Sequence, residues 1–387
     1  TETDSLDPHQ ANLVGISISS KIGKACYIPT GHIDERNLNE KDVLKILKPY
    51  LEDKSLKKIG QNIKFDYIIF WKRDIDIQSM EDTMLMSYVL DAGKNRHNMD
   101  TLSDIHLGHK TIKYKDIVGS GKKEIKFSQV ELNIAKDYAA EDADITYRLY
   151  KIFLKSLKSE KLLNIYEIFE KPLIKILASM EIKGIKLDNK FLKKLSIKFE
   201  KKIQDLEKHI FKISKKKFNI ASTKQLGEIM YNDLKIASLK KTKKGSFATG
   251  AAVLEDLAYK GNEFPKLVLE WRQSSKLKNT YSDSLPEHLN PDTKRVHTSF
   301  LLAATTTGRL ASSDPNLQNI PIKTEEGKDI RKAFISETNK KLISADYNQI
   351  EMRILADLAD VKELKKAFKN SEDIHSLTAS QVFGTDI

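Results

Sequence analysis

Residues 342–356 restrict the fold more than any other feature of the sequence. They begin with an apolar run that ends in an acid, and a helix pattern follows. Residues 342–345 are typical of a short strand, Asp346 follows them, and apolar residues then recur at helical spacing from Gln349. A carboxylate between a strand end and a helix start can bring a metal ion and a phosphate together. Taken alone, the junction is explained more simply by an Asp346 that only caps the helix.

The composition points to a polyanionic partner. The 387 residues carry a formal net charge of +12. This balance favours nucleic acid over a membrane, although simple solubility would also explain it. The single cysteine, Cys26, excludes an internal disulfide framework and fits a reducing cytoplasm. Neither a membrane-spanning run nor a signal peptide is visible. Because residue 1 is Thr and the last residues interrupt a helix pattern, we expect a fragment of a longer protein.

The length predicts two or three domains, and the first is expected to be an α/β domain over residues 1–155. Strand patterns lie at 13–19, 25–29 and 56–60, the first two joined by a hairpin. Helix patterns lie at 62–72 and 82–90. A Ser-x-x-Glu capping box at 128–131 predicts the start of a long helix that runs past Asp144.

Residues 156–295 have an almost wholly helical pattern. Asp188 is expected to cap a helix whose apolar residues recur every three or four positions: Leu192, Leu195, Phe199, Ile203, Leu206, Ile210 and Ile213. A second capping box, at 222–225, predicts another helix. A basic turn between helices contains Lys240, Lys241, Lys243 and Lys244. These lysines are either simply solvated or grip phosphates without reading sequence.

Strand patterns return in the third segment, 296–387. They lie at 296–302, 333–336 and 341–345, and the last two flank a hairpin at 337–340. A helix over 349–358 follows Asp346. The sequence therefore predicts a small mixed α/β segment after the helical one.

Acidic residues in three distant stretches of the first domain form a candidate metal site. Glu2 precedes the first strand, Asn62 and Asp66 are one helical turn apart, and so are Tyr138 and Asp142. Carboxylates that converge from separate elements can hold two divalent ions roughly 3.5–4 Å apart, which activate a water and stabilise a leaving oxygen. Each stretch alone is more simply a solvated helix face or surface chemistry.

Two long signatures resemble family A DNA polymerases. They are Asp346-Tyr-Asn-Gln-Ile-Glu-Met-Arg353 and Thr306-Thr-Gly-Arg-Leu-Ala-Ser-Ser-Asp-Pro-Asn-Leu-Gln-Asn-Ile-Pro321. The three acidic stretches resemble the motifs of the 3′–5′ exonuclease domain that precedes this polymerase, in the DEDD superfamily. The resemblance implies an RNase H-like domain over 1–155, a helical thumb over 156–295, and a partial palm with the start of the fingers over 296–387.

The resemblance also assigns roles in the exonuclease site. Glu2, Asp66 and Asp142 would be metal ligands, Asn62 would support Asp66, and Tyr138 would position the attacking water. Two Mg²⁺ (or Mn²⁺) ions per site are implied. The family's first motif reads Asp-x-Glu, and this chain begins at the x. We therefore expect the leading Asp just before Thr1, and impaired editing without it.

In the polymerase part, the resemblance makes Asp346 and the carbonyl of Tyr347 ligands of the catalytic metals. Glu351, Gln349 and His375 would lie at the incoming nucleotide. The implied DNA contacts are Arg309, Asn316 and Gln318, with Arg272, Lys276 and Lys278 on the thumb. Neither a nucleotide-binding helix followed by Tyr-Gly nor a second His-Asp-Glu acid is found, so this chain is not expected to synthesise DNA.

The expected partners are primer–template DNA, single-stranded 3′ ends and, in the parent polymerase, dNTPs. We expect a monomer that acts on the bacterial nucleoid in replication and repair. Two alternatives stay open. One is a non-catalytic module that binds primer–template DNA. The other is an RNA 3′ exonuclease of the DEDD type, which the palm signature disfavours because such an enzyme does not need a palm.

Overall fold

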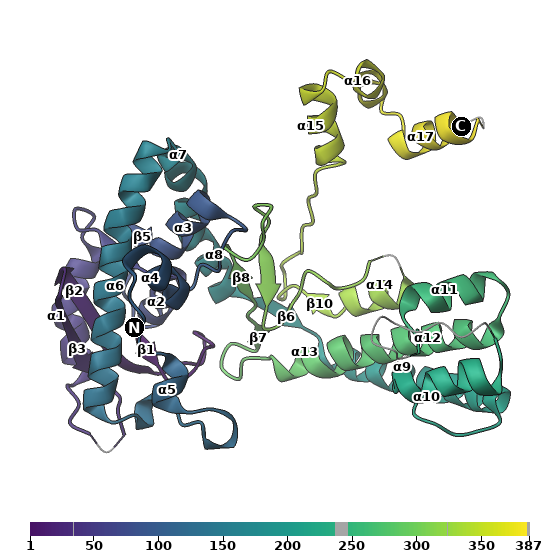
Figure 1. Cartoon of the computed structure of the whole chain (residues 1–387), viewed down its shortest axis with the longest axis horizontal. Coiled ribbons are helices and arrows are strands. Elements are labelled where there is room, and N and C mark those ends of the chain that lie inside the picture. The colour runs from purple at the N-terminus through teal and green to yellow at the C-terminus, as the bar shows by residue number, and fades with distance from the viewer. Residues whose placement is uncertain (34, 237–246, 323, 385–387) are drawn as a thin grey trace. The chain divides into compact units, whose positions relative to one another are not determined.

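The computed structural model describes residues 1–33, 35–236, 247–322 and 324–384, which form two compact units (Figure 1). The first spans Thr1–Ile335 and the second Ser336–Ile387. The basic turn with Lys240, Lys241, Lys243 and Lys244 lies outside the described residues. Within these ranges, none of the helices combines the length and apolar character that crossing a membrane requires.

The first unit begins with a three-stranded antiparallel sheet of β1 (Glu2–Thr3), β2 (Leu13–Lys21) and β3 (Lys24–Pro29). A tight turn joins β2 to β3, as predicted, and Glu2 lies opposite Gly15 in the register. Two further strands, β4 (Lys58–Gly60) and β5 (Met80–Asp82), pair in parallel. The strands predicted from the sequence of this part are thus confirmed.

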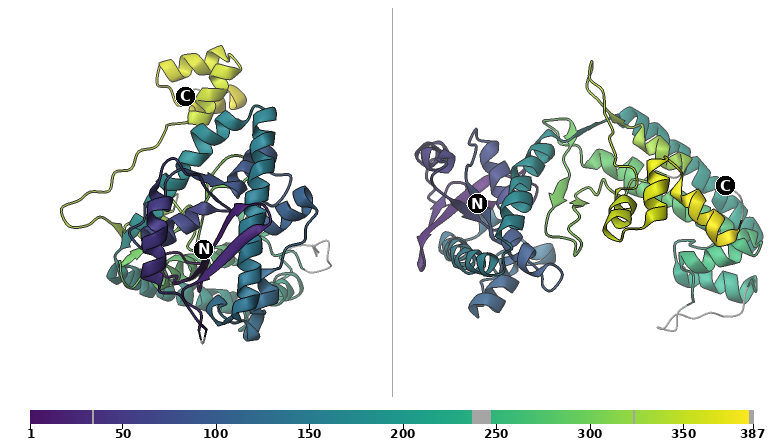
Figure 2. Two further views of the ribbon diagram at one scale, coloured as in Figure 1. Left: turned by 90° about the vertical axis from the view of Figure 1, so that its left-hand side faces the viewer. Right: turned by 90° about the horizontal axis from the view of Figure 1, so that it is seen from above.

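Helices surround these strands. They are α1 (Glu40–Glu52), α2 (Ile63–Trp71), α3 (Thr83–Asp91), α4 (Met99–Leu107), α5 (Tyr114–Val118), α6 (Leu132–Ser159) and α7 (Leu163–Ile165). The long helix α6 packs across β2 and β3 (Figure 2). The predicted long helix is therefore present, and the domain boundary expected after residue 155 falls inside it.

The predicted start of α6 was wrong. Residues Phe127–Gln129 form a separate 3₁₀ turn, and α6 begins at Leu132 with Glu131 as its N-cap. Phe127 is fully buried and Val130 nearly so. Their burial fixes this turn against the core, and that tertiary packing outweighs the local Ser-x-x-Glu signal.

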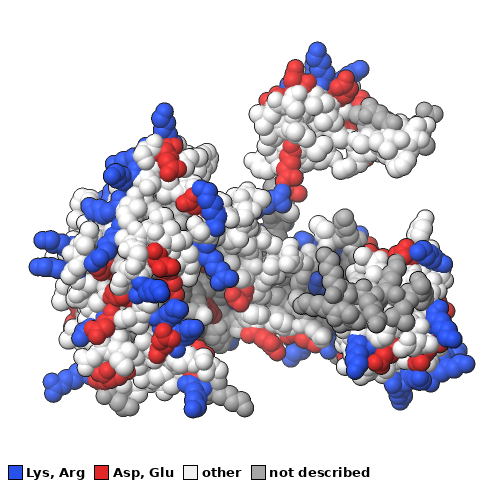
Figure 3. Space-filling model, viewed as in Figure 1, with Lys and Arg blue, Asp and Glu red and all other residues white. Residues whose placement is uncertain are grey.

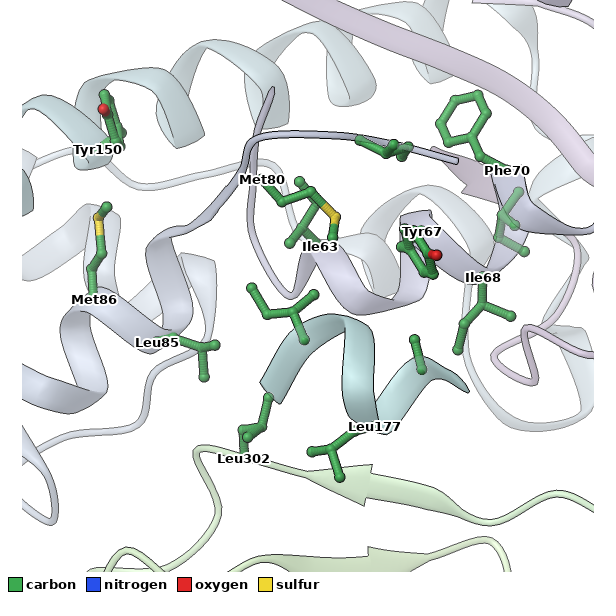
Figure 4. Packing of buried hydrophobic residues seen from close by; sticks show 14 of the residues in the cluster. Ile63, Tyr67, Ile68, Phe70, Met80, Leu85, Met86, Tyr150, Leu177 and Leu302 are labelled. Atoms are coloured by element: carbon green, nitrogen blue, oxygen red, sulfur yellow. The ribbon is translucent and has the colours of Figure 1, made fainter. Parts of the chain in front are cut away.

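A continuous apolar core joins α2, α3 and α6 to later parts of the chain (Figure 4). Ile68 on α2 and Leu85 on α3 are fully buried, and Leu177 and Leu302 belong to the same cluster. Burial of each such side chain contributes about 1.5–3 kcal/mol to folding. The α/β part is therefore packed against the segments that follow it.

The helical part contains α8 (Lys171–Lys183), α9 (Asn189–Ser214), α10 (Thr223–Gly227), α11 (Ala251–Tyr259), α12 (Glu263–Leu277) and α13 (Ser284–Glu287). Asp188 caps α9 by accepting from the backbone N–H of Phe191, and the predicted apolar stripe is buried from Leu192 to Ile210. Ser222 caps α10 as predicted. Figure 3 shows Lys and Arg side chains gathered around α10.

Short strands lie in sequence before α9 and after α13, and they pair with one another. Strand β6 (Ile185–Leu187) pairs with β7 (Arg295–Val296) and β10 (Phe334–Ile335), and β8 (Ser299–Leu301) forms a hairpin with β9 (Ala311–Ser313). The strand predicted over 296–302 is therefore divided into β7 and β8. Helix α14 (Glu325–Arg331) lies just before β10.

The second unit holds α15 (Ile350–Leu358), α16 (Lys362–Lys369) and α17 (Ile374–Phe383). The predicted strand over 341–345 was wrong, since these residues form no regular element, and α15 begins four residues after Asp346. A strand exists only where a neighbour completes its hydrogen bonds. Within the described ranges, no strand pairs with 341–345.

Candidate active site

Glu2 enters the site from the edge of a sheet. Strand β1 hydrogen-bonds to β2, and this pairing places the Glu2 side chain within electrostatic reach of Asp66 and Asp142. Burial is the main cause that raises the pKa of Glu2. The first predicted acid therefore lies on a strand, partly buried, and is not part of a solvated loop.

Asp66 is presented by the first turn of α2. Both the amine and the hydroxyl of Thr1 donate to its Oδ1, at 2.7 and 2.6 Å. Asn62 immediately precedes α2 in the left-handed conformation, at φ 59°. Its side chain makes no capping hydrogen bond to α2.

The start of α2 is held by a residue that the sequence patterns did not single out. Asp82, only 1% exposed, accepts from the backbone N–H groups of Asn62 and Ile63 at 3.1 and 3.0 Å. It also accepts from Met84 at the start of α3, at 2.9 Å. One carboxylate thus satisfies the N-termini of two helices. Burial raises its pKa to about 6.

Tyr138 and Asp142 lie one turn apart on α6, as predicted. The Tyr138 hydroxyl and the Asp142 carboxylate lie within electrostatic reach of each other. Burial first, and the charge of Glu2 second, raise the pKa of Asp142 well above its ordinary value. Burial first, and Asp142 second, also raise the pKa of Tyr138, so the phenol keeps its proton and can donate.

These residues form one electrostatic cluster from three distant elements. Burial opposes the charge on the Thr1 amine, but Asp66 and Glu2 outweigh it and raise the pKa of the amine. The cluster thus favours a positive charge beside its carboxylates. Its donors are carboxylate oxygens, which are the ligands that Mg²⁺ and Mn²⁺ prefer. The chemistry of the donor set thus fits a divalent ion.

The donor atoms are nevertheless not gathered around a single point. Among the described residues, no three His, Cys, Asp or Glu side chains are arranged to hold a metal ion. Burial is the largest cause of the raised pKa values of Glu2 and Asp142, and the neighbouring carboxylates add to it. A divalent ion would have to draw the carboxylates together.

Two neighbours of the cluster also escaped the sequence patterns. Tyr114 packs edge-on against Tyr138, with ring centroids 6.1 Å apart, and it is 42% exposed. A cavity of about 590 Å³ is lined by Asn62, Arg96 and Thr306, among others. An exposed aromatic beside Tyr138 and an arginine in the cavity that Asn62 lines can contact a nucleotide chain. Neither residue belongs to a periodic pattern that would have revealed it.

The second sequence signature, residues 306–321, lies within the first unit. Arg309 is exposed and its carbonyl accepts from the Thr305 hydroxyl at 2.8 Å. Asn316 is exposed, and its side-chain oxygen accepts from the backbone of Gln318 at 3.0 Å. Gln318 is exposed as well, and its amide donates to Leu310. All three predicted DNA contacts are therefore accessible.

The DNA contacts predicted for residues 156–295 differ in their surroundings. Arg272 donates to the carbonyl of Thr249 at 2.7 Å, and Lys278 forms ion pairs with Asp283 and Glu200 at 2.7 and 3.3 Å. These contacts are internal, so they account for both residues without DNA. Lys276, by contrast, is exposed.

In the second unit, Asp346, Tyr347, Glu351 and His375 are exposed. Gln349 caps α15 and lines a cavity of about 250 Å³ together with Arg353 and Asp373. Arg353 lies over the ring of Phe368, 4.3 Å from its centroid. The structure thus brings Gln349 close to the segment before His375, whereas Asp346 lies in an irregular stretch.

Comparisons with known proteins agree with this arrangement. Residues 1–158 match the model of a 3′-5′ exonuclease, and residues 189–387 match that of DNA polymerase family A. The fold and site thus define a chain in which an exonuclease domain precedes a polymerase region. The chain belongs to DNA polymerase family A.

Its relatives show the extent of the match. The chain is 46% identical to a DNA polymerase I of Rhizobium leguminosarum and 43% identical to one of Pseudomonas aeruginosa. Both matches cover 100% of this chain, but 40% and 43% of the relatives. Among solved structures, the POL domain of Pol1 from M. smegmatis, in complex with DNA primer-template and dNTP, is similar with a TM-score of 0.81. It is 29% identical, and the match covers 98% of this chain and 62% of that one.

Proposed function

We propose that the first unit removes nucleotides from the 3′ end of single-stranded DNA by hydrolysis, as the editing part of a DNA polymerase I. The supporting observation is the convergence of Glu2, Asp66 and Asp142 with Tyr138 in one electrostatic cluster. We further propose an RNase H-like arrangement for residues 1–155, a thumb over 156–295 and a partial palm over 296–387.

Each residue has a distinct task in this proposal. Glu2, Asp66 and Asp142 would hold two Mg²⁺ or Mn²⁺ ions, which supply an activated water and stabilise the leaving 3′ oxygen. Tyr138 remains a phenol because its pKa is raised, and it orients the attacking water as a hydrogen-bond donor or acceptor. Tyr114 offers a ring on which a terminal base can stack.

In the whole polymerase, Asp346 and the Tyr347 carbonyl would bind the metals of the synthesis site. Glu351, Gln349 and His375 would contact the incoming dNTP. Arg309, Asn316 and Gln318 would contact primer–template DNA, joined by Lys276 and the lysines of 240–244. We propose that the protein acts on DNA as a monomer. The relative solved with primer-template and dNTP supports these partners.

The decisive test is nuclease activity on a 3′-labelled single strand with Mn²⁺. We would assay this chain and a variant with an aspartate added before Thr1, which completes the Asp-x-Glu motif. Release of labelled mononucleotides that Asp142→Ala abolishes supports the proposal. The matched control is Asp137→Ala on the same helix, since the Asp137 side chain is 66% exposed and outside the cluster. The control should cleave like its parent.

A non-catalytic DNA-binding module is the second candidate. It is favoured by one observation, the absence of a ready three-ligand metal cluster among the described residues. Binding of primer–template DNA with no cleavage by either chain would select it. A steep decrease of affinity with salt would show that the basic side chains contact phosphates.

A further inference from the structure

A buried tyrosine of the exonuclease part holds the loop that carries Arg309. The Tyr88 hydroxyl, on α3, donates to the carbonyl of Thr305 at 2.8 Å and accepts from the backbone N–H of Gly308 at 3.1 Å. Tyr88 is only 5% exposed. One side chain therefore joins the two ends of a short turn just before Arg309.

A second contact fixes the same turn from its other side. Gly93, which follows α3 at φ +79°, lies so close to Thr306 that an added Cβ would come within 2.8 Å of its methyl group. Inside the turn, the Thr305 hydroxyl donates to the Arg309 carbonyl at 2.8 Å. The turn is thus held by contacts with α3 and the residues after it, which lie more than 200 positions earlier in the sequence.

We propose that Tyr88 is a positioning residue for Arg309, so that the exonuclease part sets the geometry with which the polymerase part contacts primer–template DNA. This inference rests on the proposed DNA contact of Arg309. Without the Tyr88 hydroxyl, the Gly308 N–H and the Thr305 carbonyl lose their partner. The turn then moves away from α3, and the Arg309 side chain moves with it.

The test measures the affinity of this chain for a fluorescent primer–template duplex with a recessed 3′ end, by anisotropy at fixed salt. Tyr88→Phe removes only the hydroxyl, and with it both hydrogen bonds to the turn, so we expect binding to weaken at least about fivefold. Arg309→Ala should weaken binding as well. The double variant should bind no more weakly than Arg309→Ala alone, because the two residues act through one contact.

Two further variants separate positioning from general destabilisation. Tyr150→Phe is the matched control: Tyr150 is also 5% exposed, its hydroxyl contacts Lys57, and DNA affinity should not change. Gly93→Ala pushes on Thr306 with the Tyr88 hydroxyl intact, and it should weaken binding in the wild-type chain but not in Arg309→Ala.

The outcomes are distinguishable. Equal affinity of Tyr88→Phe and wild type, or losses that add to those of Arg309→Ala, would overturn the inference and leave the proposed function intact. A wild-type chain that does not bind the duplex would overturn the DNA-binding part of the proposed function, and the inference with it.

Discussion

Lys64 on α2 and Glu181 on α8 form a buried ion pair, with 5% and 1% of each residue exposed. The same Glu181 oxygen accepts from the backbone N–H of Phe300 on β8 at 2.6 Å. The Glu181 carbonyl accepts from His297 at 2.7 Å. Helix α2 also carries Asp66, so the pair links a predicted metal ligand to the hairpin of the polymerase part.

Removing one partner of this ion pair should lower the free energy of unfolding more than replacing both partners. Lys64→Met leaves a buried carboxylate without its cation and should destabilise the chain by about 3–5 kcal/mol. Adding Glu181→Gln keeps an acceptor for Phe300 and removes the uncompensated charge, so the double variant should recover part of the loss. Urea unfolding of the four chains measures both effects. A double variant as unstable as the sum of the singles would contradict the expectation.

Asp142 should limit the stability of the metal-free chain. Its raised pKa means that the folded state disfavours the ionised form at neutral pH. Asp142→Asn, which retains the shape and a partner for Tyr138, should therefore raise the melting temperature at pH 7 without metal. Mn²⁺ should stabilise the wild type and have much less effect on the variant.

A thermal-shift titration with and without Mn²⁺ tests this pair of expectations, and Asp137→Asn serves as the control. If Asp142→Asn melts below the wild type in the absence of metal, the expectation that the ionised Asp142 carboxylate destabilises the folded chain is wrong.

The pH dependence of Asp82 can be isolated with Asp82→Asn. The folded pKa of about 6 lies above the ordinary 3.8, so the stability that Asp82 contributes is complete below pH 3.8 and is lost as the pH rises through 6. The loss amounts to about 3 kcal/mol. Asp82→Asn does not titrate. Its amide group is a donor where the backbone N–H groups of α2 and α3 need an acceptor, so the variant should be less stable than the wild type at every pH.

The stability advantage of the wild type over Asp82→Asn should therefore narrow as the pH rises from 4.5 to 7. Denaturant unfolding at several pH values gives the difference directly. An advantage that widens over this interval would reverse the sign and refute the raised pKa.

Gly15 should tolerate no side chain. A Cβ at Gly15 would lie 2.1 Å from the Tyr27 hydroxyl, and Gly15 pairs with Glu2 across the sheet. Gly15→Ala should cost about 1–3 kcal/mol through overpacking and should displace Glu2. Gly250→Ala is the control, because nothing lies within 4 Å of its added Cβ and its φ is −67°. Thermal unfolding and the nuclease assay report the two consequences.

Local patterns predicted the elements that depend on local chemistry. The stripe of α9 follows from its 3.6-residue spacing, and the Asp188 cap follows from a side chain two or three residues from its donor. The strand expected at 341–345 failed because strands depend on partners that the pattern does not contain. The capping box at Ser128 failed because burial of Phe127 decides the turn.

The residues of the candidate site also fall into two groups, those that the sequence predicted and those that only the fold reveals. The resemblance supplied Glu2, Asp66, Tyr138 and Asp142. The structure places these four within one electrostatic cluster, but among the described residues no three acids are arranged around a metal ion. Asp82 and Tyr88 act through contacts between residues 20 and 217 positions apart, for which no short sequence pattern exists. Such supporting residues become visible only in the fold.

The double cap at Asp82 has an evolutionary consequence. If editing is the function, as proposed, we expect that a lineage without need of it could lose Asp142 with a gain in stability. Position 82 is different, because two helices start from it. Its acid should outlast the activity, so a descendant that has lost editing would still carry Asp82 as a relic of the ancestral enzyme.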